Sequence, residues 1–228
     1  MMLKDTVRKK IKLFTPIYFV PFVIIITMVL AFILELGMDW DFTNGGVYPR
    51  QKQWIWTIFT SVFIHKDFSH LINNLISFTV LSGMLFYFYR SVNVRIFFAL
   101  WIFSGVLLWI IGRESRHIGA SSLVYAMASF LFFSGIIRKH IPLIAISLIV
   151  TVLYGNLIWY IFPWKNHEQI SWEGHLSGLV AGLIIAVISR KYGPQKPVKI
   201  WAEEDEEDNE NDYWKIADEP TDKNTANN

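Results

Sequence analysis

Long apolar runs are the feature that most constrains how this chain can fold. Six of them recur along 228 residues, each about 18–23 residues long. A helix of about 20 apolar residues is long enough to cross the hydrocarbon core of a bilayer. The sequence therefore predicts an all-α membrane protein with six transmembrane helices. The expected spans are roughly residues 17–36, 68–90, 94–111, 118–137, 141–163 and 172–189.

Charge is divided unevenly along the chain. Residues 1–200 hold 19 Lys and Arg against 8 Asp and Glu, whereas residues 201–228 hold 2 against 11. An acidic segment with few apolar residues buries too little surface to order itself. We therefore expect a basic cytoplasmic N-terminus (1–16), a six-helix domain (17–192) and an acidic, disordered cytoplasmic tail (193–228). The first apolar run has no small-residue cleavage site after it, so it is interpreted as a retained span and not as a signal peptide.

The positive-inside rule gives an orientation. An even number of spans places both termini on one side, and if that side is cytoplasmic the inner segments carry 13 Lys and Arg against 6 in the outer loops. The stretches "QWIWTIF" and "IFPWKNHEQISWEG" then lie outside, where Trp is expected at the water–lipid boundary. The partly apolar loop between the first two helices, residues 37–65, is expected to lie partly buried in this interface.

Polar residues gather at one depth of the predicted bundle. His70 and Asn74 lie in the first turns of the second span, Ser121 begins the fourth, and His175 lies near the start of the sixth. These three spans all run from outside to inside, so the four residues lie within about two turns of the outer helix ends. Polar groups at membrane depth are costly and usually face a bundle interior or a wet cavity.

These residue types can form a nucleophile and its base. A serine hydroxyl becomes a useful nucleophile when a neighbouring imidazole takes its proton. Glycines at every fourth position of the last span, Gly174, Gly178 and Gly182, would let the fourth span approach closely. Since Glu173 is the one carboxylate near His175 in these spans, a Ser–His pair is favoured over a triad. Tyr125 could then orient the imidazole by stacking.

Each residue alone has a simpler interpretation, as a packing serine or an interhelical hydrogen-bond partner. Metal binding has little support, because there is no Cys and no His-Glu-x-x-His pair. The other histidines are expected to be solvated or interfacial, although His65 is the strongest candidate for a further role. They are His65, His117, His140 and His167.

Three motifs together resemble those of the rhomboid intramembrane serine proteases. "HKDFSHLINN" is similar to the His-x4-His-x3-Asn pattern, "GASS" to Gly-x-Ser-Gly, and "GHLSGLVAG" to the His-x2-Gly-x3-Gly of the last span. The resemblance covers about residues 17–190. One departure is Ser122, which stands where the family usually has Gly.

The resemblance implies a six-helix rhomboid fold and cleavage of membrane-spanning substrates, which enter laterally beside the fifth span. It implies that Ser121 is the nucleophile and His175 the general base, and that His70, Asn74 and the Ser121 backbone N–H line the oxyanion hole. The supporting residues are Tyr125, Gly119, Gly178 and Gly182. No metal, cofactor or nucleic acid is expected; the expected partners are the lipid bilayer and membrane-protein substrates.

Two other hypotheses stay open. A catalytically inactive rhomboid-like protein would bind membrane clients, but such relatives typically lack the serine or the histidine. A small channel or transporter would carry polar residues through mid-membrane, whereas here they stop near the outer third. The expected location is a bacterial inner membrane, with both termini cytoplasmic and the active site near the outer face.

Overall fold

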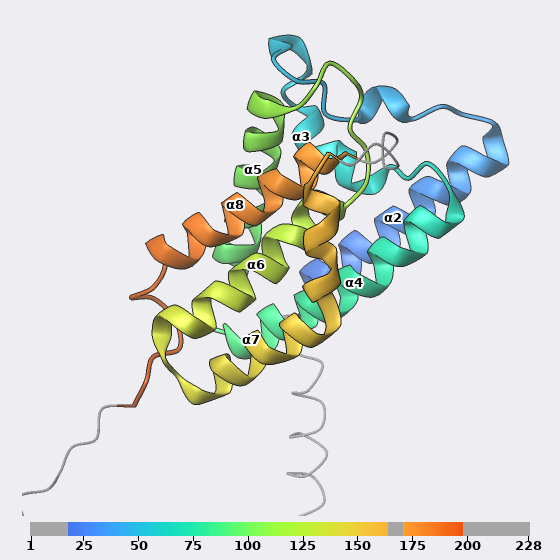
Figure 1. The fold of residues 1–228 in the computed structure, drawn as a ribbon. Coiled ribbons are helices and arrows are strands. Elements are labelled where there is room, and N and C mark those ends of the chain that lie inside the picture. The colour runs from blue at the N-terminus through green and yellow to red at the C-terminus, as the bar shows by residue number, and fades with distance from the viewer. Residues whose placement is uncertain (1–17, 164–170, 198–228) are drawn as a thin grey trace, which may run out of the picture. The chain divides into compact units, whose positions relative to one another are not determined.

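In a computed structural model, which describes residues 18–163 and 171–197, the regular elements of the chain are helices joined by loops (Figure 1). Among these residues the one extended pairing is an isolated antiparallel bridge between Val47 and His117. The longer helices are α2 (Phe19–Met38), α4 (Phe68–Phe88), α5 (Asn93–Ile111), α6 (Ser121–Arg138), α7 (Ile141–Tyr154) and α8 (Trp172–Ile188). The shorter elements are η2 (Thr43–Gly45), η3 (Lys52–Trp54), α3 (Thr57–Thr60), η4 (Ser61–Phe63) and η5 (Gly155–Ile161).

Five helices of the described region are long and apolar enough to cross a membrane. They are α2, α4, α5, α6 and the continuous stretch of α7 and η5, Ile141–Ile161. The sixth apolar helix, α8, has 17 residues and is shorter than the other five. By its helix composition the protein is therefore a multi-pass membrane protein.

Large apolar side chains on the outside of the helices agree with a lipid environment. Ile141 and Val152 of α7 are 80% and 76% exposed, and Phe19 of α2 is 65% exposed. A soluble protein rarely exposes apolar side chains in such continuous patches. These faces of α2 and α7 are accounted for if acyl chains cover them.

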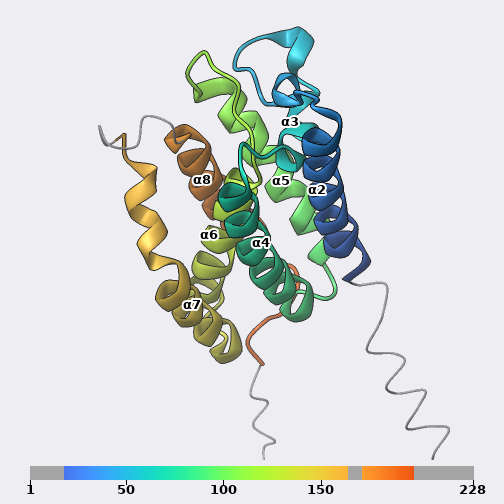
Figure 2. The ribbon, with the colours of Figure 1, turned by 90° about the vertical axis from the view of Figure 1, so that its right-hand side faces the viewer.

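Helix α6 is the central element of the bundle. Over an apolar stretch of 18 residues in each helix, 72% of α6 is buried, against 22% of α2 and 22% of the Ile141–Ile161 stretch. Its most extensive packing is with α8, and it also contacts α4, α5 and α7 (Figures 1 and 2). A helix with all its faces covered can carry polar groups that lipid would exclude.

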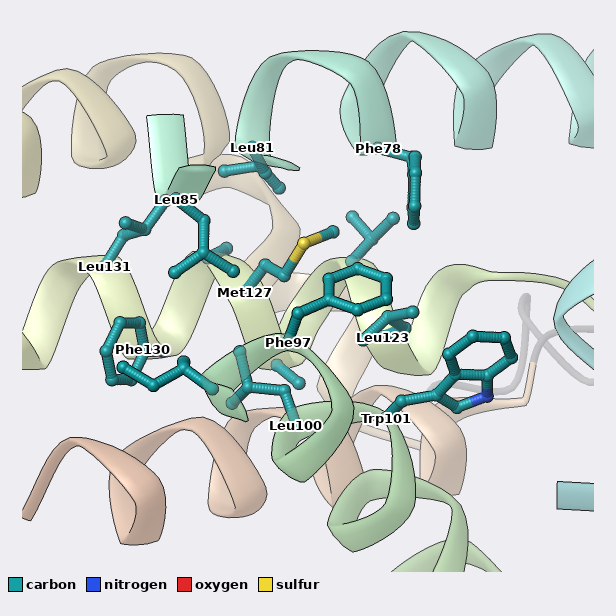
Figure 3. Packing of buried hydrophobic residues seen from close by; sticks show 14 of the residues in the cluster. Phe78, Leu81, Leu85, Phe97, Leu100, Trp101, Leu123, Met127, Phe130 and Leu131 are labelled. Carbon is teal, nitrogen blue, oxygen red and sulfur yellow. The ribbon is translucent and has the colours of Figure 1, made fainter. Parts of the chain in front are cut away.

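The core between α4, α5 and α6 is made of interlocking aromatic and aliphatic side chains (Figure 3). Phe97 of α5 lies edge-on to Phe78 and Phe86 of α4, with ring centroids 6.0 and 5.6 Å apart. Such edge-to-face pairs contribute about 1 kcal/mol beyond their buried area. This packing holds α4 and α6 in a fixed relation, on which the geometry of the site depends.

The segment between α2 and α4 folds over α5 and is partly buried. Val47 and Ile58 are 1% and 4% exposed. The indole Nε1–H of Trp101 donates to the Ile58 carbonyl at 3.1 Å. A side chain at Gly105 would collide with Ile58, so α5 needs a glycine there.

The chain divides by its internal contacts into two units, Met1–Lys196 and Pro197–Asn228. The second unit lies almost entirely outside the described residues. The predicted basic N-terminus (1–16), His167 and nearly all of the predicted acidic tail also lie outside them.

Candidate active site

Ser121 is the first residue of α6, and a turn before it sets its position. Helix α6 begins three residues later than the predicted span, because Gly119 has a φ of 100°, which lies in the left-handed region that favours glycine. The Gly119 N–H donates to the Ser61 carbonyl at 2.9 Å. The N–H of Ser121 is among the first of the helix, which have no partner within it. This N–H makes no hydrogen bond to the described residues, so it can serve a ligand.

Close packing of α8 on α6 brings His175 to the same end of the bundle. A Cβ at Gly178 would meet the Tyr125 Cβ at 2.7 Å, and one at Gly182 would meet the Ser129 Cβ at 2.6 Å. Real Cβ contacts are not this short, so the two backbones approach each other only because these residues are glycines.

The imidazole of His175 is held by two contacts that fix its orientation. Its Nδ1 lies 2.9 Å from the Tyr160 carbonyl, and its ring stacks on that of Tyr125, with centroids 4.2 Å apart and an interplanar angle of 7°. A carbonyl only accepts, so Nδ1 carries the proton and Nε2 carries the lone pair. Tyr125 is fixed in turn, since its hydroxyl donates to the Leu157 carbonyl at 2.8 Å. His175 therefore presents a basic nitrogen.

No carboxylate completes a triad among the described residues. Glu173 is 2% exposed and makes an ion pair with Arg113, with the Arg113 Nε 3.6 Å from the Glu173 Oε1. The hydrogen bond of the His175 Nδ1 goes to the carbonyl of Tyr160. The carbonyl thus occupies the place where a triad would have its acid.

Two polar side chains of α4 lie beside the turn that precedes Ser121. A Cβ at Gly119 would lie 2.5 Å from the His70 Nε2 and 3.6 Å from the Asn74 Nδ2. Asn74 donates one N–H to the His70 carbonyl at 2.9 Å, so its other N–H is available. The backbone N–H of His70 donates to Asp67, which caps α4. His70 and Asn74 therefore lie beside the turn that leads into Ser121.

Five of the predicted site residues line one cavity of about 810 Å³. A volume of this size accommodates a segment of peptide. Its wall comes from α4, from the loop between α5 and α6, and from α7 with η5. The predicted residues that line it are Ser121, His175, His70, Asn74 and Tyr125. Gly119, Gly178 and Gly182 lie behind them and permit the close approach of the backbones.

His65 and His117 are buried within the protein, so the expectation that they are solvated is wrong, and His65 is the exception that the sequence favoured. They are 1% and 4% exposed, and both lie outside the spanning helices. The ring of His65 lies edge-on to that of His70, with centroids 5.1 Å apart. His117 binds Ser171, the N-cap of α8. The sequence carried a signal for the cap, since a serine immediately before "WEGH" is a typical N-cap, but none for its contact with His117.

Within the described ranges, no three His, Cys, Asp or Glu side chains come together in a way that could hold a metal ion.

Comparison with known proteins identifies the family. The Rhomboid domain matches residues 52–192, which include every residue of the cavity wall, and the chain therefore belongs to the rhomboid family. It is similar to uncharacterized proteins of Mycobacterium bovis and Mycobacterium tuberculosis, at 30% identity over 151 residues, which are 63% of this chain and 63% of each relative. An uncharacterized protein of Mycobacterium leprae is 27% identical over 153 residues, which are 64% of this chain and 60% of that relative. The chain thus spans less than two thirds of the length of these bacterial relatives.

Proposed function

We propose that this protein is an intramembrane serine endopeptidase that cleaves transmembrane segments of membrane proteins with a Ser121–His175 dyad. The observation that carries the proposal is the shared cavity. A hydroxyl, an oriented imidazole with its lone pair on Nε2, and two side-chain donors all face it from three different helices. Membership of the rhomboid family, which includes serine intramembrane proteases, supports the same reaction.

In the first step, the Ser121 Oγ attacks the carbonyl carbon of the substrate peptide bond while His175 Nε2 takes the hydroxyl proton. The carbonyl oxygen becomes an oxyanion, which His70, Asn74 and the Ser121 N–H stabilise as donors. The dipole at the start of α6 favours the same charge. The contact of Nδ1 with Tyr160 stabilises the imidazolium, and the stack on Tyr125 keeps the ring in place.

In the second step, the C–N bond breaks and His175 returns its proton to the leaving amine. A water molecule then attacks the resulting ester on Ser121 while His175 takes a proton from it. The bond between the acyl carbon and Ser121 Oγ breaks, and His175 returns the proton to this Oγ. Cleavage requires the substrate helix to unwind locally, because a helical peptide bond is shielded by its own hydrogen bonds. A polar cavity bordered by α4 and by α7 with η5 supports entry of such a segment laterally, beside α7.

The proposal includes a topology. Helix α8 is the sixth span, both termini are cytoplasmic, and the cavity opens near the outer face of a bacterial inner membrane. The positive-inside distribution of Lys and Arg supports this orientation. The segment between α2 and α4 then lies in the outer interface, where its Trp40, Trp54 and Trp56 would meet lipid headgroups.

Purified protein reconstituted with a reporter that carries a single transmembrane helix tests the activity. Ser121→Ala and His175→Ala should each reduce cleavage by at least roughly 10³-fold, because each removes a member of the dyad. Ser122→Gly is the matched control, since it changes the neighbouring serine to the usual residue of the family, and it should cleave within a few-fold of the unmodified protein. If Ser121→Ala cleaves at the original rate, the proposal is wrong.

The alternative, a rhomboid-like protein that binds clients without cutting them, gives a different result with an active-site probe. A fluorophosphonate should label Ser121 in the protease and should not label the Ser121→Ala variant. Absence of labelling together with stable capture of the uncut reporter would favour the alternative.

A further inference from the structure

His117 links the segment that carries Ser121 to the helix that carries His175. Its Nδ1 lies 2.6 Å from the Ser171 Oγ, and its Nε2 lies 3.0 Å from the Arg113 carbonyl. Its backbone is held as well, because its N–H and carbonyl both pair with Val47, at 2.9 and 2.8 Å. The side chain is 4% exposed, so none of these hydrogen bonds is shared extensively with bulk water.

The chemistry of the partners fixes the direction of these bonds. The Arg113 carbonyl only accepts, so the Nε2 of His117 carries a proton. In a neutral imidazole the Nδ1 then accepts, and the Ser171 hydroxyl is its donor. Burial lowers the pKa of His117 and so favours the neutral ring near pH 7, although the Arg113 carbonyl and Glu173 partly oppose this.

Ser171 has a second bond, which connects His117 to α8. Its Oγ accepts from the Gly174 N–H at 3.3 Å and thus caps the helix. A Cβ at Gly174 would approach this Oγ to 3.0 Å, so glycine leaves room for the cap. The resulting chain runs from the Gly174 N–H to Ser171, from Ser171 to His117, and from His117 to Arg113.

This series of hydrogen bonds has a role because of where it lies relative to the dyad. His117 lies four residues before Ser121, and Ser171 lies four residues before His175. In a helix, four residues correspond to about one turn and about 6 Å, so Ser171 and His175 lie on one side of α8. The His117–Ser171 bond therefore joins the same two segments as the dyad, about one turn away from it. Both His117 and Ser171 also line the cavity.

We propose that His117 is a positioning residue for peptide cleavage, which sets the distance between Ser121 and His175 through its hydrogen bond to Ser171. The inference rests on the protease function proposed above. Nucleophile and base react only when their distance is held within a narrow range, and a displacement of about 1 Å can reduce the rate roughly 10²-fold. The ion pair between Arg113 and Glu173 joins the same loop to the start of α8, at 3.6 Å, and it stays in place when the His117–Ser171 bond is removed.

The Nε2 of His117 also lies 3.5 Å from the Ser115 Oγ. Two substitutions of His117 separate the contact of its Nδ1 from the contacts of its Nε2. In His117→Asn, the Oδ1 lies where Nδ1 was and can accept from Ser171, whereas the bond to Arg113 is lost. In His117→Gln, the amide N–H can reach the Arg113 carbonyl, whereas the acceptor for Ser171 is lost. We expect His117→Asn to retain kcat within a few-fold. We expect His117→Gln to lose kcat by roughly 10- to 100-fold and to change kcat more than KM, since the dyad is displaced.

The same comparison can be made at Ser171. Thr and Val have nearly the same shape, but only Thr keeps the hydroxyl. Ser171→Thr should retain the rate of fluorophosphonate labelling at Ser121. Ser171→Val should lose it at least to the extent of His117→Gln, because it also removes the cap on the Gly174 N–H. The double variant His117→Gln/Ser171→Val should be no slower than Ser171→Val alone, because both single variants remove the same His117–Ser171 bond.

A structural readout distinguishes failure of this inference from failure of the proposed function. Hydrogen exchange at the first turn of α8 should accelerate in His117→Gln and not in His117→Asn. If the unmodified protein neither cleaves nor labels while this exchange pattern holds, the protease function is wrong and the hydrogen bond has no catalytic role. If the unmodified protein cleaves, and His117→Asn and His117→Gln have equal kcat, the positioning role of His117 is overturned.

Discussion

At the scale of single residues, Gly119 illustrates how local conformation creates the site. Its φ of 100° turns the chain so that α6 begins at Ser121, and the absence of a side chain leaves room for His70. An alanine at this position would be strained by the backbone conformation and would also collide with the imidazole. The glycine of "GASS" is therefore required by the geometry of the turn, independently of any resemblance to a family.

His65 gives the molecule a stability that depends on pH. Burial, reinforced by the neighbouring His70, lowers the pKa of His65 to about 4, although the Phe63 carbonyl partly opposes this shift. The unfolded chain takes up the proton first as the pH falls from about 6.5. The stabilisation from a neutral His65 is thus complete above pH 6.5 and is lost as the pH falls towards 4, by roughly 3 kcal/mol in total.

His65→Phe tests this dependence, since phenylalanine keeps an aromatic ring and does not titrate. In detergent, the free energy of unfolding of the unmodified protein should fall more steeply between pH 7 and pH 4.5 than that of the variant. Over this pH range, the free energy of unfolding of the unmodified protein should fall by about 2.5 kcal/mol more than that of the variant. Parallel curves would show that His65 is not buried and neutral in the folded protein.

At the scale of elements, the pair of α6 and α8 is joined at both ends. At the end away from the site, the buried guanidinium of Arg138 donates to main-chain carbonyls that follow α8, and its positive charge complements the C-terminal dipole of that helix. Between the two ends, glycines bring the backbones together. The carbonyl partners of Arg138 belong to Ser189, Arg190, Tyr192 and Pro194.

Gly182→Ala tests the close approach of these helices. Its added Cβ would lie 2.6 Å from the Ser129 Cβ and 2.7 Å from the Phe130 N, so α8 must move away from α6. We expect a loss of stability of roughly 1–3 kcal/mol together with lower activity, because His175 moves with α8. Gly83→Ala is the matched control: Gly83 lies within α4, and nothing lies within 4 Å of its added Cβ. This control should gain up to about 1 kcal/mol from helix propensity, and equal effects of the two substitutions would contradict the packing argument.

At the scale of the whole molecule, the sequence predicts those features of the fold and the site that depend on the local pattern of apolar and polar residues. Apolar length locates the helices to within a few residues, and polar residues near helix starts identify Ser121, His175, His70 and Asn74 as candidates. The His117–Ser171 bond could not be predicted, because its partners are 54 residues apart and both lie outside helices. The burial of His65 depends equally on tertiary packing, and nothing in the residues beside it distinguishes a buried ring from a solvated one.

The proposed topology of the molecule can be tested directly, because the chain contains no cysteine. Lys52→Cys lies in the segment between α2 and α4, and Lys191→Cys follows α8; both side chains are exposed. A membrane-impermeant maleimide added to intact spheroplasts should label Lys52→Cys at once and should label Lys191→Cys only after the membrane is opened. The unmodified protein has no cysteine, so any labelling that it shows is the background to be subtracted. The opposite order would place the cavity on the cytoplasmic side, because Lys52 and the cavity wall at Lys66 and Arg116 belong to loops on the same side of the predicted spans.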